Sequence, residues 1–155
     1  YIHDGKIKSA IDLCQRYDSP VARLVEKGIE RIGRPLQDIQ TAVENMGNVE
    51  VARLEKGLPM LATIAGGAPM IGFLGTVTGM IEAFFRMSTA GNNIDITLLS
   101  GGIYEAMVTT VGGLFVGIIA YFGYNFLTSQ ISNLVFKMES TTIEFIDMLH
   151  EPAGK

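Results

Sequence analysis

Two long stretches without a charged side chain constrain the fold of this chain more than any other feature. Residues 57–81 give 25 positions without Asp, Glu, Lys or Arg, and residues 106–136 give 31. At about 1.5 Å rise per residue, a helix of either length exceeds the roughly 30 Å hydrocarbon core of a bilayer. The alternative is a soluble all-α core, but core helices seldom run this far without a charge on one face. The sequence therefore predicts an all-α membrane protein with two transmembrane helices.

A short polar segment, residues 87–95, separates the two stretches, so the spans are expected to form a helical hairpin. Arg53 and Lys56 precede the first span and Lys137 follows the second, whereas the turn side has only Arg86. The positive-inside bias therefore predicts cytoplasmic termini for this segment and an outer turn. The predicted parts are cytoplasmic amphipathic helices at 1–56, transmembrane helices at 57–86 and 96–136, the turn at 87–95, and a cytoplasmic helical tail at 137–155.

The flanking segments have the signals of short amphipathic helices. Ser19 followed by Pro20 is typical of a helix start, Gly33 of a helix end, and Pro35 of the next start. From Leu36 the apolar pattern would allow one helix to run unbroken into the first span. The tail keeps apolar positions at Met138, Ile143, Ile146 and Leu149.

Glu105 is the only side chain charged at neutral pH among residues 96–136. A carboxylate within a transmembrane helix is energetically costly, and such acids often belong to ion or proton paths. We therefore expect Glu105 to lie on a proton path. The alternative is that Glu105 lies at the membrane edge, hydrogen-bonded to a neighbouring helix or to water.

Small and hydroxyl side chains recur at steps of three or four along both spans, which favours close approach of helix backbones. The glycines expected in such packing are Gly72, Gly75, Gly79, Gly113 and Gly117. Thr76, Thr109 and Thr110 either bond to carbonyls of their own helix or face an interior path with Glu105. Thr109 shares the Glu105 face of a regular helix, whereas Thr110 is rotated away from it.

Composition excludes several other functions. A net charge of −4 without a basic cluster argues against nucleic acid as a partner. The sequence has no phosphate-binding loop, nucleophile elbow or Cys/His cluster, so we expect no enzyme, no metal site and no cofactor. Cys14 stands alone and is expected to be a small buried residue. Because the chain starts at Tyr1 without Met, it is expected to be part of a longer protein.

Two motifs resemble a known family. Residues 71–80 read Ile-Gly-Phe-Leu-Gly-Thr-Val-Thr-Gly-Met, and residues 102–114 read Gly-Ile-Tyr-Glu-Ala-Met-Val-Thr-Thr-Val-Gly-Gly-Leu. These runs resemble signatures of the second and third transmembrane helices of the MotA/TolQ/ExbB proton-channel proteins. Residues 19–23, Ser-Pro-Val-Ala-Arg, are similar to a cytoplasmic segment of ExbB and TolQ. The ExbB/TolQ branch fits better than the flagellar MotA branch, and ExbB slightly better than TolQ.

The resemblance implies a homopentamer in the bacterial inner membrane that encloses the helices of two ExbD- or TolR-type subunits. It further implies that the proton-motive force drives a TonB-type protein for outer-membrane transport, or a TolA-type protein of the Tol-Pal envelope system. By position, Glu105, Thr76 and Thr110 match the family's third-helix glutamate and its two pore threonines. A rival interpretation is a non-conducting membrane scaffold.

Two departures accompany the resemblance. The family has a transmembrane helix before the cytoplasmic segment, and this chain begins after that point. The family's shorter polar residue near Glu82 is replaced by an acid that is expected to pair with Arg86.

Overall fold

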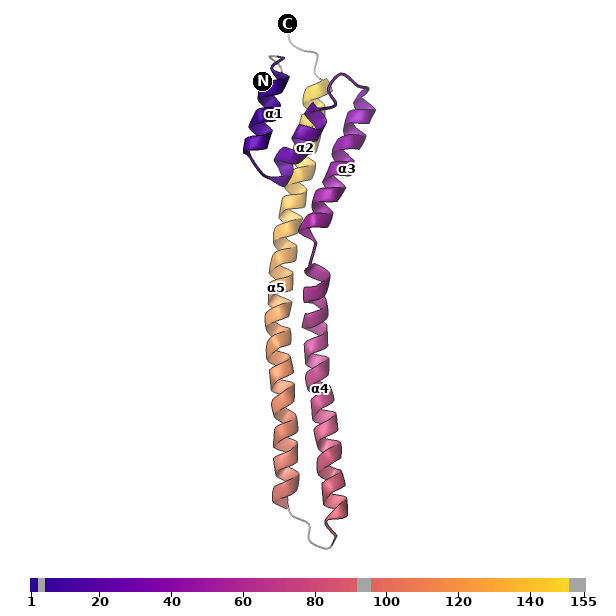
Figure 1. Ribbon diagram of the computed structural model, residues 1–155, viewed down its shortest axis with the longest axis vertical. Helices are drawn as coiled ribbons and strands as arrows, with labels where there is room; N and C mark the ends of the chain where they lie inside the picture. The colour runs from indigo at the N-terminus through magenta and orange to yellow at the C-terminus, as the bar shows by residue number, and fades with distance from the viewer. Residues whose placement is uncertain (3–4, 92–95, 151–155) are drawn as a thin grey trace. The chain divides into compact units, whose positions relative to one another are not determined.

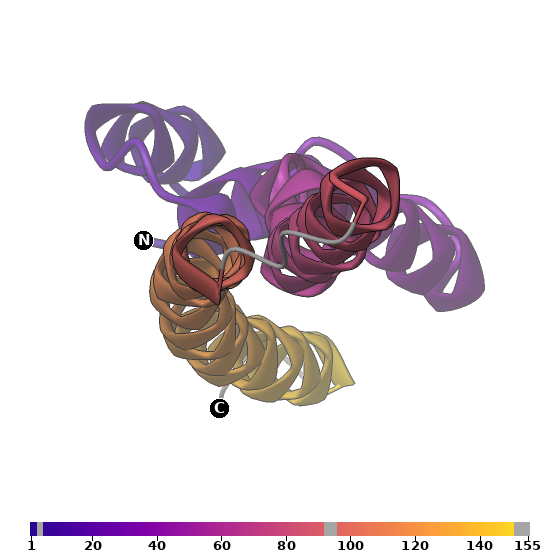
Figure 2. The ribbon, with the colours of Figure 1, turned by 90° about the horizontal axis from the view of Figure 1, so that it is seen from below.

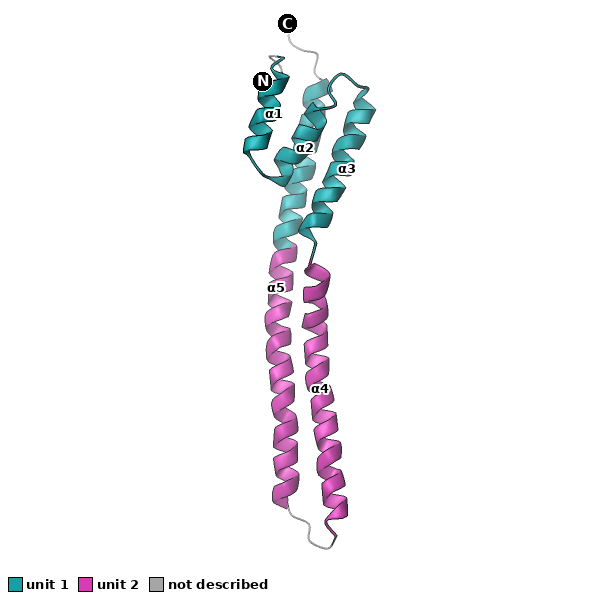
Figure 3. Cartoon of the chain, viewed as in Figure 1, with its two compact units in different colours: residues 1–56, 129–155 teal, residues 57–128 magenta. Residues whose placement is uncertain are grey.

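The computed structural model describes residues 1–2, 5–91 and 96–150, and every regular element within them is a helix (Figure 1). The elements are α1 (Ile7–Arg16), α2 (Pro20–Ile29), α3 (Leu36–Leu54), α4 (Leu58–Thr89) and α5 (Ile96–His150). Of the expected turn at 87–95 and tail at 137–155, residues 92–95 and 151–155 lie outside the described part. The chain forms two compact units (Figure 3), unit 1 from residues 1–56 and 129–155 and unit 2 from residues 57–128.

The signals at the helix ends of unit 1 operate as the sequence predicts. The backbone N–H of Ala22 donates to the Ser19 hydroxyl at 3.2 Å, which confirms Ser19 as the N-cap of α2. Gly33 has a φ of 98°, a left-handed conformation that separates α2 from α3. The possibility of one unbroken helix from Leu36 onward is wrong, because α3 ends at Leu54 and Gly57 has a φ of 96°.

Unit 1 has a well-packed apolar core. Its buried members are Ala10, Leu24, Ile29, Ile39, Val43, Met138 and Phe145. The Phe145 ring lies so close to Gly28 that a Cβ on Gly28 would overlap it. Phe145 is seven residues after Met138 and therefore shares its helix face, whereas Ile143 is 62% exposed, contrary to the expected apolar face of the tail.

Unit 2 consists of α4 and residues 96–128 of α5, which run antiparallel and side by side (Figures 1 and 2). The backbones approach closely at Gly113, where a Cβ would come within 2.6 Å of the Ala68 carbonyl oxygen. Toward the other end, a Cβ on Gly79 would come within 2.7 Å of the Ala106 Cβ. Small residues therefore form the helix–helix contact, as is usual in membrane proteins.

Large apolar side chains of unit 2 point outward. Met70, Ile71 and Phe115 are each about two-thirds exposed or more, and Tyr104 is also exposed. Two helical stretches, within residues 36–89 and 96–150, are long and apolar enough to cross a membrane. The predicted all-α class is confirmed, and the two long apolar helices are consistent with a membrane hairpin.

Candidate functional site

The three threonines singled out by the sequence meet where α4 crosses α5. The Thr76 hydroxyl lies 3.1 Å from the Ala106 carbonyl oxygen, and the Thr110 hydroxyl lies 3.2 Å from that of Gly72. The two hydroxyls also contact each other. Thr109 reaches the Ala106 carbonyl of its own helix at 2.7 Å and the Gly72 carbonyl at 3.3 Å. All three hydroxyls thus join the two helices through backbone carbonyls.

The glycines of the motifs make this meeting possible. A Cβ on Gly72 would come within 2.9 Å of the Thr109 carbonyl oxygen, and a Cβ on Gly75 would overlap the Thr109 side chain. Farther along, a Cβ on Gly117 would come within 2.5 Å of the Pro69 ring. Any side chain at these glycines would push the helices apart, so the threonines could no longer reach across.

Glu105 lies in a cleft of unit 2, with a volume of about 490 Å³. The polar residues that line the cleft are Thr78, Glu82 and Arg86 of α4 and Thr97, Glu105 and Thr109 of α5. Most of the remaining lining residues are glycine or alanine, which leaves space beside the carboxylate. Glu105 is exposed and makes no hydrogen bond or ion pair with any residue that the structure describes.

Charge is concentrated in this cleft. Within the described residues of unit 2, the charged side chains are Glu82, Arg86 and Glu105, and all three line it. Arg86 donates to Glu82 across 2.5 Å, which confirms the expected pair. Both side chains are about two-thirds exposed, so the pair itself contributes little stability.

The site residues therefore separate into two groups. Thr109 lines the cleft with Glu105, as the shared helix face predicts. Thr76 and Thr110 are absent from the cleft lining and lie at the helix crossing instead. The part that any of these residues plays in a proton path stays a prediction.

Unit 1 contains a buried charge that sequence reasoning missed. The Glu50 side chain is 1% exposed, and its carboxylate accepts from Arg23 at 2.7 Å and from Arg53 at 2.9 Å. The hydrogen bond from Arg23 outweighs burial and holds the pKa of the Glu50 carboxyl below its ordinary value. A signal existed, because Glu50 falls on the same face of α3 as Ile39 and Val43.

Cys14 is half-buried against the apolar core of unit 1. Burial raises the pKa of its thiol, and the nearby Glu26 carboxylate acts in the same direction. An unreactive packing role is consistent with this environment. Among the described residues, no group of three or more His, Cys, Asp or Glu is placed to hold a metal ion.

A sequence model of the MotA/TolQ/ExbB proton channel family matches residues 16–140, which include most of the described helices and both motifs. The chain belongs to this family. Membership confirms the resemblance and makes the chain a membrane transport component and not an enzyme. The two long apolar helices are consistent with a membrane protein of this family.

Individual relatives of the family carry both ExbB and TolQ names. An ExbB homolog from Methanothermobacter thermautotrophicus is 32% identical over 80% of this chain and 43% of the relative. TolQ from Haemophilus influenzae is 36% identical over 68% of this chain and 46% of the relative. ExbB from Xanthomonas campestris is 35% identical over 59% of this chain and 36% of the relative. The chain thus matches less than half the length of each of these relatives.

Proposed function

We propose that this chain is a proton-channel subunit of an inner-membrane motor that couples the proton-motive force to a TonB-type protein. In this proposal Glu105 lies on the proton path. The family membership supports the proposal, and one structural observation carries it. The Glu105 carboxylate is exposed in a cleft and unpaired within the described chain, so it is available to a proton or to a partner helix.

The proposed arrangement places residues 57–86 and 96–136 in the membrane, with residues 1–56 and 137–155 in the cytoplasm. Arg53, Lys56 and Lys137 support this orientation. The outward-facing apolar side chains of unit 2 would contact lipid, neighbouring copies in a homopentamer, and an ExbD- or TolR-type single-span subunit. The protonated aspartate of the motor would belong to that subunit.

A proton that crosses 100 mV gains about 2.3 kcal/mol. This energy suffices to bias one step of a partner helix against a smooth surface, but not to break a large apolar interface. The small residues and satisfied threonine hydroxyls at the α4–α5 crossing favour a rigid hairpin whose outer surface stays unchanged during turnover. Glu105 would then relay protons or act on the partner's aspartate through its charge.

The experiment replaces Glu105 by Gln in the full-length protein expressed with its single-span partner. We expect Glu105→Gln to abolish proton-driven uptake while the complex still assembles, because Gln keeps the side chain's size but cannot carry a proton. Glu144→Gln is the matched control, since Glu144 is an exposed acid on the same helix but in unit 1. Normal uptake or envelope function with Glu105→Gln would refute the proposal.

A TolQ-type role in the Tol-Pal system is a second candidate, favoured by the 36% identity to Haemophilus influenzae TolQ. The channel chemistry would be the same, and only the partner would differ. Complementation separates the two roles: an ExbB-type subunit restores TonB-dependent uptake to a strain lacking ExbB and TolQ, whereas a TolQ-type subunit restores envelope integrity.

A non-conducting scaffold is favoured by one observation, namely that the threonine hydroxyls all bond to backbone carbonyls. A scaffold would tolerate Glu105→Gln and Thr76→Val and would fail when the glycine contacts are filled. The Glu105 experiment therefore decides between the scaffold and both channel roles.

A further inference from the structure

The register of α4 against α5 orders the charged residues along the cleft. Gly79 lies opposite Ala106, and a Cβ on Gly102 would come within 2.7 Å of the Ala83 Cβ. Glu105 is therefore level with about residue 80 of α4. At about 1.5 Å rise per residue, Arg86 lies about 9 Å farther toward the Thr89 end of α4.

The general tilt of helix side chains would bring Arg86 and Glu105 toward each other across this interval. Side chains of a helix tilt toward its N-terminus. For Arg86 this direction runs along α4 toward Leu58, and for Glu105 it runs along α5 toward Ile96. Because the helices are antiparallel, the two tilts converge, and Glu82 lies between the two levels. A long Arg side chain and a Glu side chain can together span a gap of this size.

We propose that Glu82 is a counterion that keeps the Arg86 guanidinium away from Glu105. This assignment rests on the proposed function of Glu105 in proton transfer. Arg86 cannot lose its proton, and it carries donors on every nitrogen of the guanidinium. Without Glu82, the acid that remains in the cleft among the described residues of unit 2 is Glu105. Arg86 would then pair with Glu105 and hold its carboxylate in the charged form.

The 2.5 Å contact between Arg86 and Glu82 has a function under this proposal although it adds little stability. Because Arg86 is paired with Glu82, the space beside Glu105 stays open although all three charged residues line the same cleft. Glu82 is accordingly a positioning residue: it acts on the proton path through Arg86 and not by carrying the proton itself.

The test is a double-variant cycle in the full-length protein, purified with its single-span partner and placed in vesicles of phosphatidylethanolamine and phosphatidylglycerol. Proton flux is followed with a pH-sensitive dye under an imposed pH gradient. We expect Glu82→Gln to lower the flux about tenfold, within the range of coupling between contacting charges. Adding Arg86→Met to Glu82→Gln should restore most of the flux, because the competing guanidinium is then absent.

A second measurement reports on Glu105 without relying on flux. A hydrophobic carbodiimide reacts with a protonated carboxyl, and the adduct at Glu105 is quantified by mass spectrometry. Glu82→Gln should suppress labelling of Glu105, and the double variant should recover it. A merely structural role for Glu82 would not produce this paired loss and recovery.

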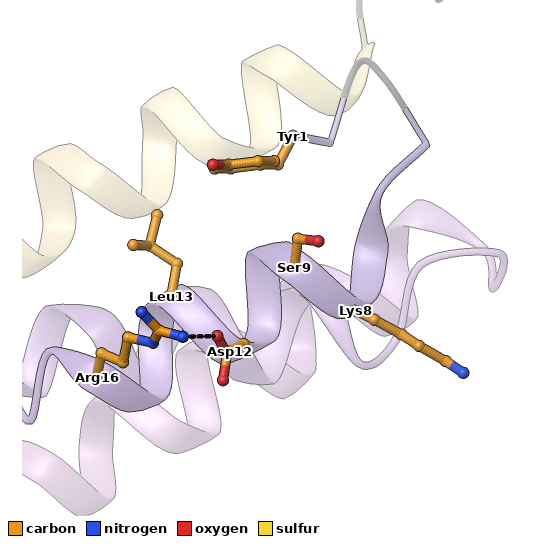
Figure 4. Close-up of a pocket in the computed structure, with 6 residues that line it drawn as sticks. All are labelled: Tyr1, Lys8, Ser9, Asp12, Leu13 and Arg16. Atoms are coloured by element: carbon orange, nitrogen blue, oxygen red, sulfur yellow. Dashed lines mark ion pairs between the residues drawn. The ribbon is translucent and has the colours of Figure 1, made fainter.

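Asp12 and Arg16 provide a matched control pair in unit 1 (Figure 4). Like Glu82 and Arg86, they are an acid and an arginine four residues apart, with a contact of 2.8 Å and side chains that are 61% and 74% exposed. Asp12→Asn should leave both proton flux and Glu105 labelling unchanged. A similar loss of proton flux or of Glu105 labelling with Asp12→Asn would show that the effect is not specific to the cleft, and it would overturn the proposal.

The proposal is overturned if the double variant is no better than Glu82→Gln alone, which would instead mean that Glu82 itself is required. It is also overturned if Glu82→Gln changes neither flux nor labelling. Both results leave the proposed function standing as long as Glu105→Gln abolishes flux. If Glu105→Gln conducts normally, the proposed function itself is refuted. This result is distinct from the two outcomes above, which concern only Glu82.

Discussion

Unit 1 and unit 2 use their apolar residues in opposite ways. In unit 1, Val43 and Met138 are 1% and 2% exposed, and even a carboxylate is buried with two arginines as partners. In unit 2 the buried residues are small, such as Gly72 and Ala106, while Phe115 is 68% exposed. Unit 1 can therefore gain stability from its own core in water, whereas unit 2 needs lipid or partner helices to cover its surface.

The consequence is that the two units should respond differently to the same kind of change. Unit 1 should be sensitive to lost apolar volume and to unpaired charge, as a soluble domain is. Unit 2 should be sensitive to added volume, because backbone proximity replaces large interlocking side chains. The following predictions test this contrast from the largest expected effect to the smallest.

Gly113→Leu should abolish the α4–α5 contact. A Cβ at Gly113 already comes within 2.6 Å of the Ala68 carbonyl oxygen, and neither backbone can move without separating the helices. Overpacking typically costs about 1–3 kcal/mol, and a leucine pressed against a backbone carbonyl belongs at the upper end of this range. The measurement is the yield of folded complex after detergent extraction, with helix proximity checked by a cysteine cross-link between the spans.

The neighbouring glycine supplies the control for that change. A Cβ at Gly112 meets nothing within 4 Å, so Gly112→Leu should leave the hairpin of a single chain intact. An equal loss of folded complex from Gly112→Leu and Gly113→Leu would contradict the assignment of the helix crossing to Gly113. Damage from Gly112→Leu that appears only in the oligomer would place Gly112 at a contact between copies.

Glu50→Ala should destabilise unit 1 by about 2 kcal/mol. The change leaves Arg23 without its buried partner, but the Arg23 side chain is 30% exposed and keeps a contact with Asp18, so the loss is smaller than for a fully buried pair. Thermal unfolding in detergent micelles, monitored by circular dichroism, measures the effect. Glu44→Ala, at an exposed acid on the same helix, should stay within about 0.5 kcal/mol of the parent protein.

Acid should weaken unit 1 through the same carboxylate. The folded-state pKa of Glu50 lies below its value in the unfolded chain, mainly because of the hydrogen bond from Arg23. Its stabilising contribution is therefore complete above the unfolded pKa of about 4.3 and is lost as the pH falls through the folded pKa. Unfolding midpoints measured from neutral pH downward should decline in the parent protein more steeply than in Glu50→Gln. Parallel curves would show that Glu50 contributes no pH dependence.

The sequence predicts those features of the fold that depend on local signals. The charge-free runs predict both long helices, and Ser19 predicts the start of α2, because these signals are local. The apolar pattern could not predict the break at Gly57, because the pattern on both sides of it permits a helix. The helix is interrupted only by the left-handed backbone conformation of Gly57.

The candidate site was predictable in composition but not in arrangement. The sequence placed Glu105 and Thr109 on one face, and both line the cleft. It could not show that Thr76 and Thr110 meet at the helix crossing, because that depends on the register between α4 and α5. Glu50 was overlooked for a related reason: an acid on an apolar face gains its partner Arg23 only when α2 packs against α3.

The smallest effect is expected for Thr76→Val. Valine keeps the volume of threonine but removes the hydroxyl that lies 3.1 Å from the Ala106 carbonyl oxygen. Hydrogen bonds between membrane helices contribute about 0.6 kcal/mol on average, so the hairpin should lose no more than about 1 kcal/mol. Thr63→Val is the control, because Thr63 does not line the cleft and its hydroxyl donates to the Pro59 carbonyl of its own helix at 2.8 Å.

Comparing stability with proton flux in these two variants separates packing from conduction at Thr76. If Thr76 only joins the helices, Thr76→Val and Thr63→Val should both keep nearly full flux in the assembled channel. If the Thr76 hydroxyl also borders the proton path, Thr76→Val should lower the flux far more than a stability loss of this size explains. A large loss of stability with Thr76→Val would instead contradict the premise that unit 2 depends mainly on close backbone contact.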